Sequence, residues 1–203
     1  LHRVLELEPA NVDAHIRAGQ FAMEDERWEE AFIAWGLVRR LYPSHPTASL
    51  HVAQTLLAMQ RPEAARPLLK EYLDRMDSNA DQDEKLLVAE LLLSASEPTM
   101  ASSLLAPLCK ELDDQDPKKV VCLRLLAVTL FASGKLDEGA AVSRKVLRFN
   151  PQCISSIHNL ALAGLSNHRY RSSWGWVQRG LAIDPHDDDL RRLRSRLLWS
   201  QIK

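Results

Sequence analysis

The sequence predicts an all-α protein built from repeated pairs of antiparallel helices. Leu and Ala account for 57 of its 203 residues, whereas Val, Ile and Thr together account for 21. That mixture favours helices over strands. A regular step recurs along the chain, and the apolar residues inside each step have helical spacing. Together these observations indicate a solenoid in which each unit is one helix pair.

Prolines mark the repeat. Three pairs of prolines have the same separation: Pro9 and Pro43, Pro117 and Pro151, and Pro151 and Pro185. This separation equals the length of a common helix-pair repeat, about 34 residues. Asp77 follows Pro43 by the same step, but Pro117 follows Asp77 by a longer one, so one unit carries six extra residues. We therefore divide a single domain, residues 1–203, into a half-unit, five units and an end helix: 10–43, 44–77, 78–117, 118–151, 152–185 and 187–203.

Within each unit, two apolar blocks are separated by a short polar turn. We expect helices over Val12–Glu24 and Trp28–Leu41 in the first unit, and over Val120–Ala132 and Leu136–Phe149 in the fourth. A turn this short makes the two helices antiparallel. Small residues recur where such helices would touch, and they allow close approach: Gly19, Ala53, Ala89, Ala127 and Ala161 in the first helices, and Ala31, Ala65, Gly139 and Ser173 in the second.

The third unit differs because of its extra length. The five residues from Pro67 resemble the five from Pro107, which lie at the same longer step. We therefore expect the insertion between Asp77 and Pro107, in the polar loop Ser78–Asp83, in the turn Ser94–Thr99, or in both. Both prolines fall inside second helices, where the missing amide hydrogen and the ring favour a kink. Such a kink would change the local curvature of the solenoid. A functional bend that opens a binding surface is the alternative.

The C-terminal segment is typical of an end helix. It opens with Asp187, Asp188 and Asp189 and continues with four arginines, an order that agrees with the helix dipole. A solenoid needs such a helix to cover its last repeat. An RNA- or phosphate-binding surface is the alternative, and the neighbouring aspartates weaken it.

This pattern resembles the tetratricopeptide repeat (TPR) family over essentially the whole chain. The best-matching positions lie in the first and last units: Gly19, Trp28, Ala31, Trp35 and Pro43, and Leu160, Ala161, Tyr170, Leu181 and Pro185. The resemblance implies a right-handed superhelical solenoid of about five repeats plus terminal half-repeats. It also implies a concave groove, lined mostly by the first helix of each unit.

Composition and motifs argue against several functions. A net charge of −1 does not suit a polybasic protein that binds nucleic acid or a membrane surface. Cys109, Cys122 and Cys153 are an odd number without clustered spacing, so we expect neither a disulfide framework nor a zinc site, and a cytoplasmic location. Catalytic signatures such as HExxH, GxSxG and the P-loop do not occur. We therefore expect a protein that is not an enzyme and uses no cofactor or metal.

The groove positions implied by the TPR resemblance form the candidate site. They are polar and of mixed charge toward the N-terminal end and more apolar toward the C-terminal end. The candidates are Arg17, Gln20, Glu24, His51, Gln54, Glu90, Arg124, Val128, Phe131, His158, Asn159, Leu162 and Leu165. For the apolar members, packing between helix layers is the alternative to ligand contact.

This set favours a protein-interaction scaffold that binds a peptide or a partner helix with a few hydrophobic anchors. Some TPR proteins hold a C-terminal carboxylate through a clamp of cations and asparagines. Arg124 and Asn159 match two clamp positions, but Val128 stands where an asparagine belongs, so the clamp is incomplete.

Two other functions stay open. The chain could be the substrate-reading or regulatory region of a larger multidomain enzyme such as a transferase. It could also self-associate through the N-terminal half-repeat, where Val4, Leu5 and Leu7 form an apolar edge. We expect no membrane insertion, since the longest apolar stretch is too short to cross a bilayer.

Overall fold

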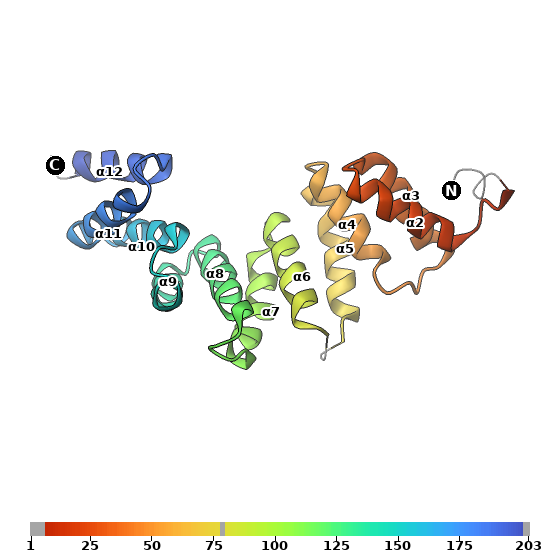
Figure 1. The fold of residues 1–203 in the computed structure, drawn as a ribbon, viewed down its shortest axis with the longest axis horizontal. Coiled ribbons are helices and arrows are strands. Elements are labelled where there is room, and N and C mark those ends of the chain that lie inside the picture. Colours follow the sequence, from red (N-terminus) through yellow and green to blue (C-terminus); the bar gives the residue numbers. More distant parts are fainter. Residues whose placement is uncertain (1–6, 78–79, 201–203) are drawn as a thin grey trace. The chain divides into compact units, whose positions relative to one another are not determined.

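The computed structural model describes residues 7–77 and 80–200, and every regular element in those ranges is a helix. The chain divides into two compact units, residues 1–97 and 98–203. The first contains α2 (Val12–Glu24), α3 (Trp28–Leu41), α4 (Ala48–Ala58), α5 (Pro62–Arg75) and α6 (Gln82–Ser94). The second contains α7 (Pro98–Glu111), α8 (Pro117–Ala132), α9 (Leu136–Phe149), α10 (Ile154–Ser166), α11 (Tyr170–Ile183) and α12 (Asp188–Ser200). Consecutive helices pack against each other within each unit (Figure 1). The all-α prediction is confirmed, whereas a single domain over residues 1–203 stays a prediction.

The turn between the two helices of a pair has the same backbone geometry each time. One residue of the turn is in the left-handed region, with φ of 56° at Glu26 and 75° at Gly134. The next residue donates its N–H to a carbonyl five residues back, which closes the end of the first helix. This bond joins five pairs: Arg27 to Ala22, Arg61 to Leu56, Glu97 to Leu92, Lys135 to Leu130 and Arg169 to Gly164.

The small residues predicted at the helix contacts are buried. Ala53, Ala89, Ala127 and Ala161 have no exposed surface. At Gly19 a Cβ atom would lie 2.6 Å from Trp35 Nε1, so only glycine allows this indole to pack against α2. Close approach through small side chains therefore sets the spacing of the pairs.

The predicted position of the six extra residues is correct for two of them and wrong for the other four. The second helices of the pairs begin at Trp28, Pro62, Pro98, Leu136 and Tyr170. Relative to the regular step, two extra residues precede α7, and four lie between the starts of α7 and α9. Pro67 is the sixth residue of α5 and Pro107 the tenth of α7, so the local match between them does not mark equivalent positions. Both helices continue through their prolines.

The cysteine prediction is also corrected. Cys109 of α7 and Cys122 of α8 form a disulfide, with their Cα atoms 5.7 Å apart. Sequence spacing misses it because the α7–α8 turn, and not a motif, brings the two residues together. The cytoplasmic location stays a prediction, and this bond does not favour it.

Helix α12 covers the end of the second unit as predicted. Leu190, Leu193 and Leu197 are buried in a cluster with Ala161 and Val177. The arginines of α12 are exposed.

Only part of the apolar edge expected in the N-terminal half-repeat lies within the described residues. Val4 and Leu5 lie outside the described residues, and Leu7 is exposed. None of the described helices is long and apolar enough to span a membrane.

We predict that Gly19→Ala lowers the free energy of unfolding by about 1–3 kcal/mol, because the added methyl group collides with the buried Trp35 ring. Urea unfolding followed by circular dichroism measures the change. The matched control is Gly36→Ala in α3, where a Cβ atom would meet nothing within 4 Å. That variant should be unchanged or more stable by about 0.5–1 kcal/mol. Equal effects of the two substitutions would contradict the close-approach argument.

We also predict that the disulfide stabilises the second unit by about 3 kcal/mol, because it closes a loop with a sequence separation of 13. The double variant Cys109→Ala/Cys122→Ala should melt at a lower temperature than the oxidised wild type. Cys153→Ala should leave the melting temperature nearly unchanged, because this thiol is free. Thiol titration of the denatured, unreduced protein should find one free cysteine, and finding three would show that the bond does not form.

Candidate functional site

The predicted groove residues of the first unit lie on three helices. Arg17, Gln20 and Glu24 are exposed on α2, and Glu90 is exposed on α6. Their spacing on α2 places the first three on one side of that helix. These positions agree with a solvent-facing surface, and their role in binding a ligand stays a prediction.

The two predicted residues on α4 are engaged inside the unit. The His51 ring stacks on Trp35, with the ring centroids 4.1 Å apart. Its Nδ1 atom is 2.8 Å from Gln54 Oε1. Burial lowers the pKa of His51, His45 contributes in the same direction, and the hydrogen bond to Gln54 opposes them. A half-buried, neutral ring that packs on a tryptophan is best explained as part of the core.

The predicted residues of the second unit lie on α8 and α10, which contact each other. Arg124 and Val128 are exposed on α8, and His158 and Asn159 are half-buried on α10. We call these four residues the α8–α10 face. They include the two residues that match clamp positions, and the structure places them on adjacent helices.

The apolar candidates beside this face pack into the core. Phe131 contacts the cluster that contains Leu160, and it occupies the space that a Cβ atom at Gly139 would need. Leu162 and Leu165 pack against the cluster that contains Val177. Packing between layers therefore explains most of their burial, and only their remaining surface borders the α8–α10 face.

A thiol next to this face was not singled out as a site residue. Cys153 is the N-cap of α10, and its Sγ atom is 3.3 Å from Ser155 Oγ. Burial raises the pKa of this thiol, but hydrogen bonds from Ser155 and Ser156 and the charge of Arg124 outweigh burial and lower it. Arg124 therefore acts electrostatically on the start of α10, which its distant place in the sequence does not reveal.

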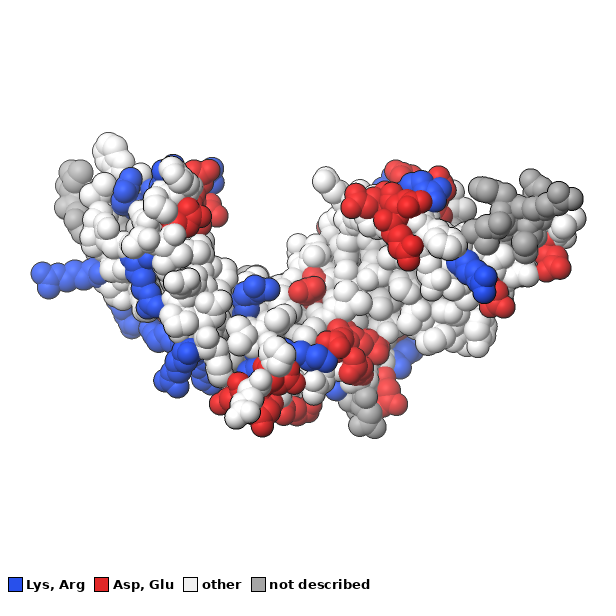
Figure 2. Space-filling model, viewed as in Figure 1, with Lys and Arg blue, Asp and Glu red and all other residues white. Residues whose placement is uncertain are grey.

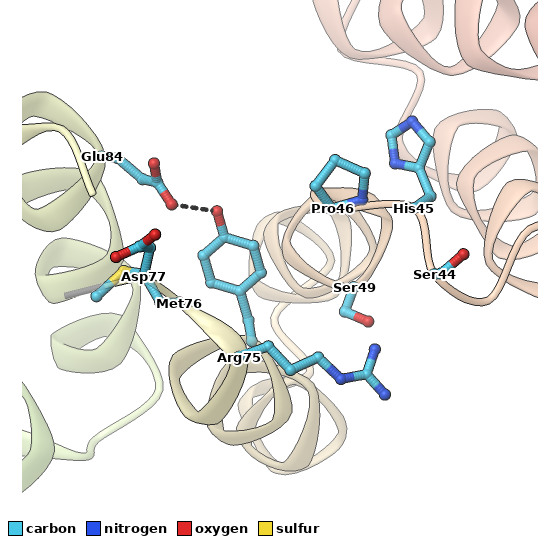
Figure 3. Close-up of a pocket in the computed structure, with 9 residues that line it drawn as sticks. Ser44, His45, Pro46, Ser49, Arg75, Met76, Asp77 and Glu84 are labelled. Carbon is cyan, nitrogen blue, oxygen red and sulfur yellow. Dashed lines mark hydrogen bonds between the residues drawn. The ribbon is translucent and has the colours of Figure 1, made fainter. Parts of the chain in front are cut away.

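The first unit also contains a cavity of about 380 Å³ that sequence reasoning missed (Figure 3). It lies between the α3–α4 loop, α5 and the start of α6. Two of its polar side chains have acidic partners: Tyr72 donates a hydrogen bond of 2.6 Å to Glu84 Oε1, and Arg75 pairs at 3.2 Å with Glu71, which lies outside the lining. Burial, the bond to Glu84 and its negative charge raise the pKa of Tyr72. The Tyr72–Glu84 hydrogen bond joins α5 to α6, whereas the Arg75–Glu71 pair lies within α5.

The described residues do not show the pattern of a metal site. Within residues 7–77 and 80–200, no three His, Cys, Asp or Glu side chains gather as metal ligands would. A second cavity, in the second unit, was also missed because its basic residues come from three helices.

Comparison with known proteins gives a likeness in structure only. No protein-family model matches the chain, and no curated protein matches its sequence. Among solved structures, the TPR protein YrrB, described as having an unusual peptide-binding site, is similar with a TM-score of 0.75 and 14% identity, covering 96% of this chain and 97% of YrrB. MamA from Desulfovibrio magneticus RS-1 has a TM-score of 0.70 and 13% identity, covering 87% and 97%. PilF from Pseudomonas aeruginosa has a TM-score of 0.63 and 16% identity, covering 92% and 82%.

These identities are low, so the likeness establishes the architecture and leaves ligands open. It agrees with the regular repeat step, the short left-handed turns and the buried small residues at each helix contact. The chain therefore has the tetratricopeptide repeat fold.

Proposed function

We propose that the chain is a protein-interaction scaffold that holds a peptide or a partner helix on the α8–α10 face, without chemistry. The observation that carries this proposal is the combination of exposed Arg124 and Val128 with Asn159 on the adjacent helix. On α4, by contrast, His51 and Gln54 bind each other and pack on Trp35. The α8–α10 face therefore has polar groups left for a ligand.

The side chains of this face suggest what they would bind. Arg124 would pair with a carboxylate of the ligand, and the Asn159 amide can both donate to and accept from a peptide backbone. Val128, with 40% of its surface exposed and one turn from Arg124 on α8, offers an apolar contact. A peptide with a carboxylate close to an apolar side chain fits this arrangement. The peptide-binding site of YrrB, a structural relative, supports the same class of ligand.

We predict that peptides selected from a random display library on the full chain bind Arg124→Gln/Val128→Asn about tenfold more weakly. The reason is the loss of one charge-assisted hydrogen bond and one apolar contact. Fluorescence anisotropy of labelled peptides measures the affinities. The control variant is Arg171→Gln, an exposed arginine of α11 outside this face. Peptides that bind both variants as tightly as the wild type would place their site elsewhere and contradict the proposal.

We further predict that Cys153 reacts with iodoacetamide with a midpoint pH below that of an ordinary cysteine. A lowered pKa means that the reactive thiolate forms at lower pH. Ser155→Ala and Arg124→Gln should each raise this midpoint, Ser155→Ala by more, because its hydrogen bond stabilises the thiolate more than the arginine charge does. Mass spectrometry of the alkylated peptide follows the rate over pH. An unchanged midpoint in Arg124→Gln would show that the charge of Arg124 does not act on Cys153 at the start of α10.

A further inference from the structure

The small net charge of the chain hides two units of opposite charge. Residues 1–97 contain 10 Lys and Arg against 17 Asp and Glu, a net charge of −7. Residues 98–203 contain 16 Lys and Arg against 10 Asp and Glu, a net charge of +6. In the view of Figure 2, Lys and Arg gather over α9 and α11 of the second unit. The second unit therefore attracts anions although the whole chain is nearly neutral.

A cavity of about 500 Å³ opens on this unit between α7, α8 and α9. This volume lies within the range of small-ligand and side-chain pockets. Five side chains give it an apolar lining: Ala106, Leu123, Leu126, Val142 and Phe149. Phe149 keeps 39% of its surface exposed, so its ring is accessible to a ligand in the cavity.

The rim of this cavity is basic. Lys119 donates to the Leu112 carbonyl at 2.8 Å and pairs with Asp114 at 3.1 Å. Lys110, Lys145 and Arg148 also line the cavity, and among the described residues they have no acidic partner. Asp114 is the one acidic residue in the lining. Three cations are thus left around an apolar floor.

The cavity lies on the opposite side of α8 from the proposed peptide face. Lys119 and Val128 are nine residues apart, which is two and a half turns of an α-helix, so their side chains point to opposite sides. The Cys109–Cys122 disulfide joins two of the three helices that form the cavity, and Cys109 lines it. The walls are therefore held in place before a ligand arrives.

We propose that this cavity is a second docking site, which takes an acidic segment of another protein with one apolar anchor side chain. The unpaired cations match the acidic residues of the segment, and the apolar lining matches its anchor. A membrane surface would meet the charges but leave the concave lining empty. Nucleic acid would pair with the cations, but Phe149 is the one aromatic ring in the lining on which a base could stack, and the other apolar side chains of the lining are aliphatic. An acidic segment with an anchor uses both features.

The test measures binding of labelled short peptides, rich in Glu and Asp with a central Phe or Leu, to the full oxidised chain by fluorescence anisotropy. We expect Lys145→Gln/Arg148→Gln to weaken binding about tenfold, and replacement of the central apolar residue by Ser to weaken it by a similar factor. The matched control is Lys135→Gln/Arg171→Gln, which removes the same charge from exposed positions outside the cavity. It should change the affinity less than about twofold. Melting temperatures establish that each variant is folded.

Three results would overturn the proposal. The first is equal weakening by the control variant, which would show attraction to overall charge alone. The second is binding of single-stranded DNA or phosphatidylserine vesicles that equals peptide binding and is lost in the same variant. The third is concentration-dependent association of the chain with itself that Lys145→Gln/Arg148→Gln abolishes, because a second copy would then be the occupant. Arg124→Gln/Val128→Asn should leave acidic-peptide binding intact, so this site can fail without affecting the α8–α10 face.

Discussion

The close approach of paired helices within each unit is the constraint on which the other features depend. A buried small residue lets one helix of a pair lie directly against the other. In the second unit, Ala127 of α8 and Gly139 of α9 are such residues. The short turn then has one conformation that joins the helix ends, with a left-handed residue and a backbone bond to the carbonyl five residues back. Because this geometry recurs, first helices such as α8 and α10 come to lie side by side, and the candidate peptide face follows from that placement.

The turns show that packing, and not turn propensity, imposes this conformation. Glycine adopts the left-handed region freely, yet only Gly134 is a glycine among the five turn residues; the others are Glu26, Gln60, Ser96 and His168. A residue with a side chain costs about 1–2 kcal/mol in that region. The buried contacts on both sides of each turn offset that cost. The polar gaps between apolar blocks therefore indicate where the turns lie, although four of the five turns lack the glycine that usually marks such a turn.

Features set by periodicity were predictable, and features set by contacts between helices were not. The helix Leu136–Phe149 has the predicted bounds because its apolar spacing ends at polar residues on both sides. Four of the six extra residues were misplaced because the similar residues that begin with Pro67 and Pro107, five in each run, occur at different turns of α5 and α7. The sequence pattern did not predict the disulfide or the basic cavity, because the residues of each come from separate helices. The net charge of the whole chain did not reveal the basic second unit, because it sums two units of opposite charge.

Helix α8 shows how far a periodic pattern can go toward a binding site. A 3.6-residue period separates the side of Arg124 and Val128 from the side of Leu123 and Leu126, so both surfaces are present in the sequence. The neighbours of α8 decide which residues on each side are available. Phe131 fills the space over Gly139 and packs in the core, whereas Val128, one turn earlier, stays exposed. On the other side, α7 and α9 stand far enough apart over Leu123 and Leu126 to leave a cavity. Some side chains of α8 make its contacts with adjacent helices, and other side chains remain available to ligands on two opposite sides. One helix can thus support two binding surfaces with different chemistry.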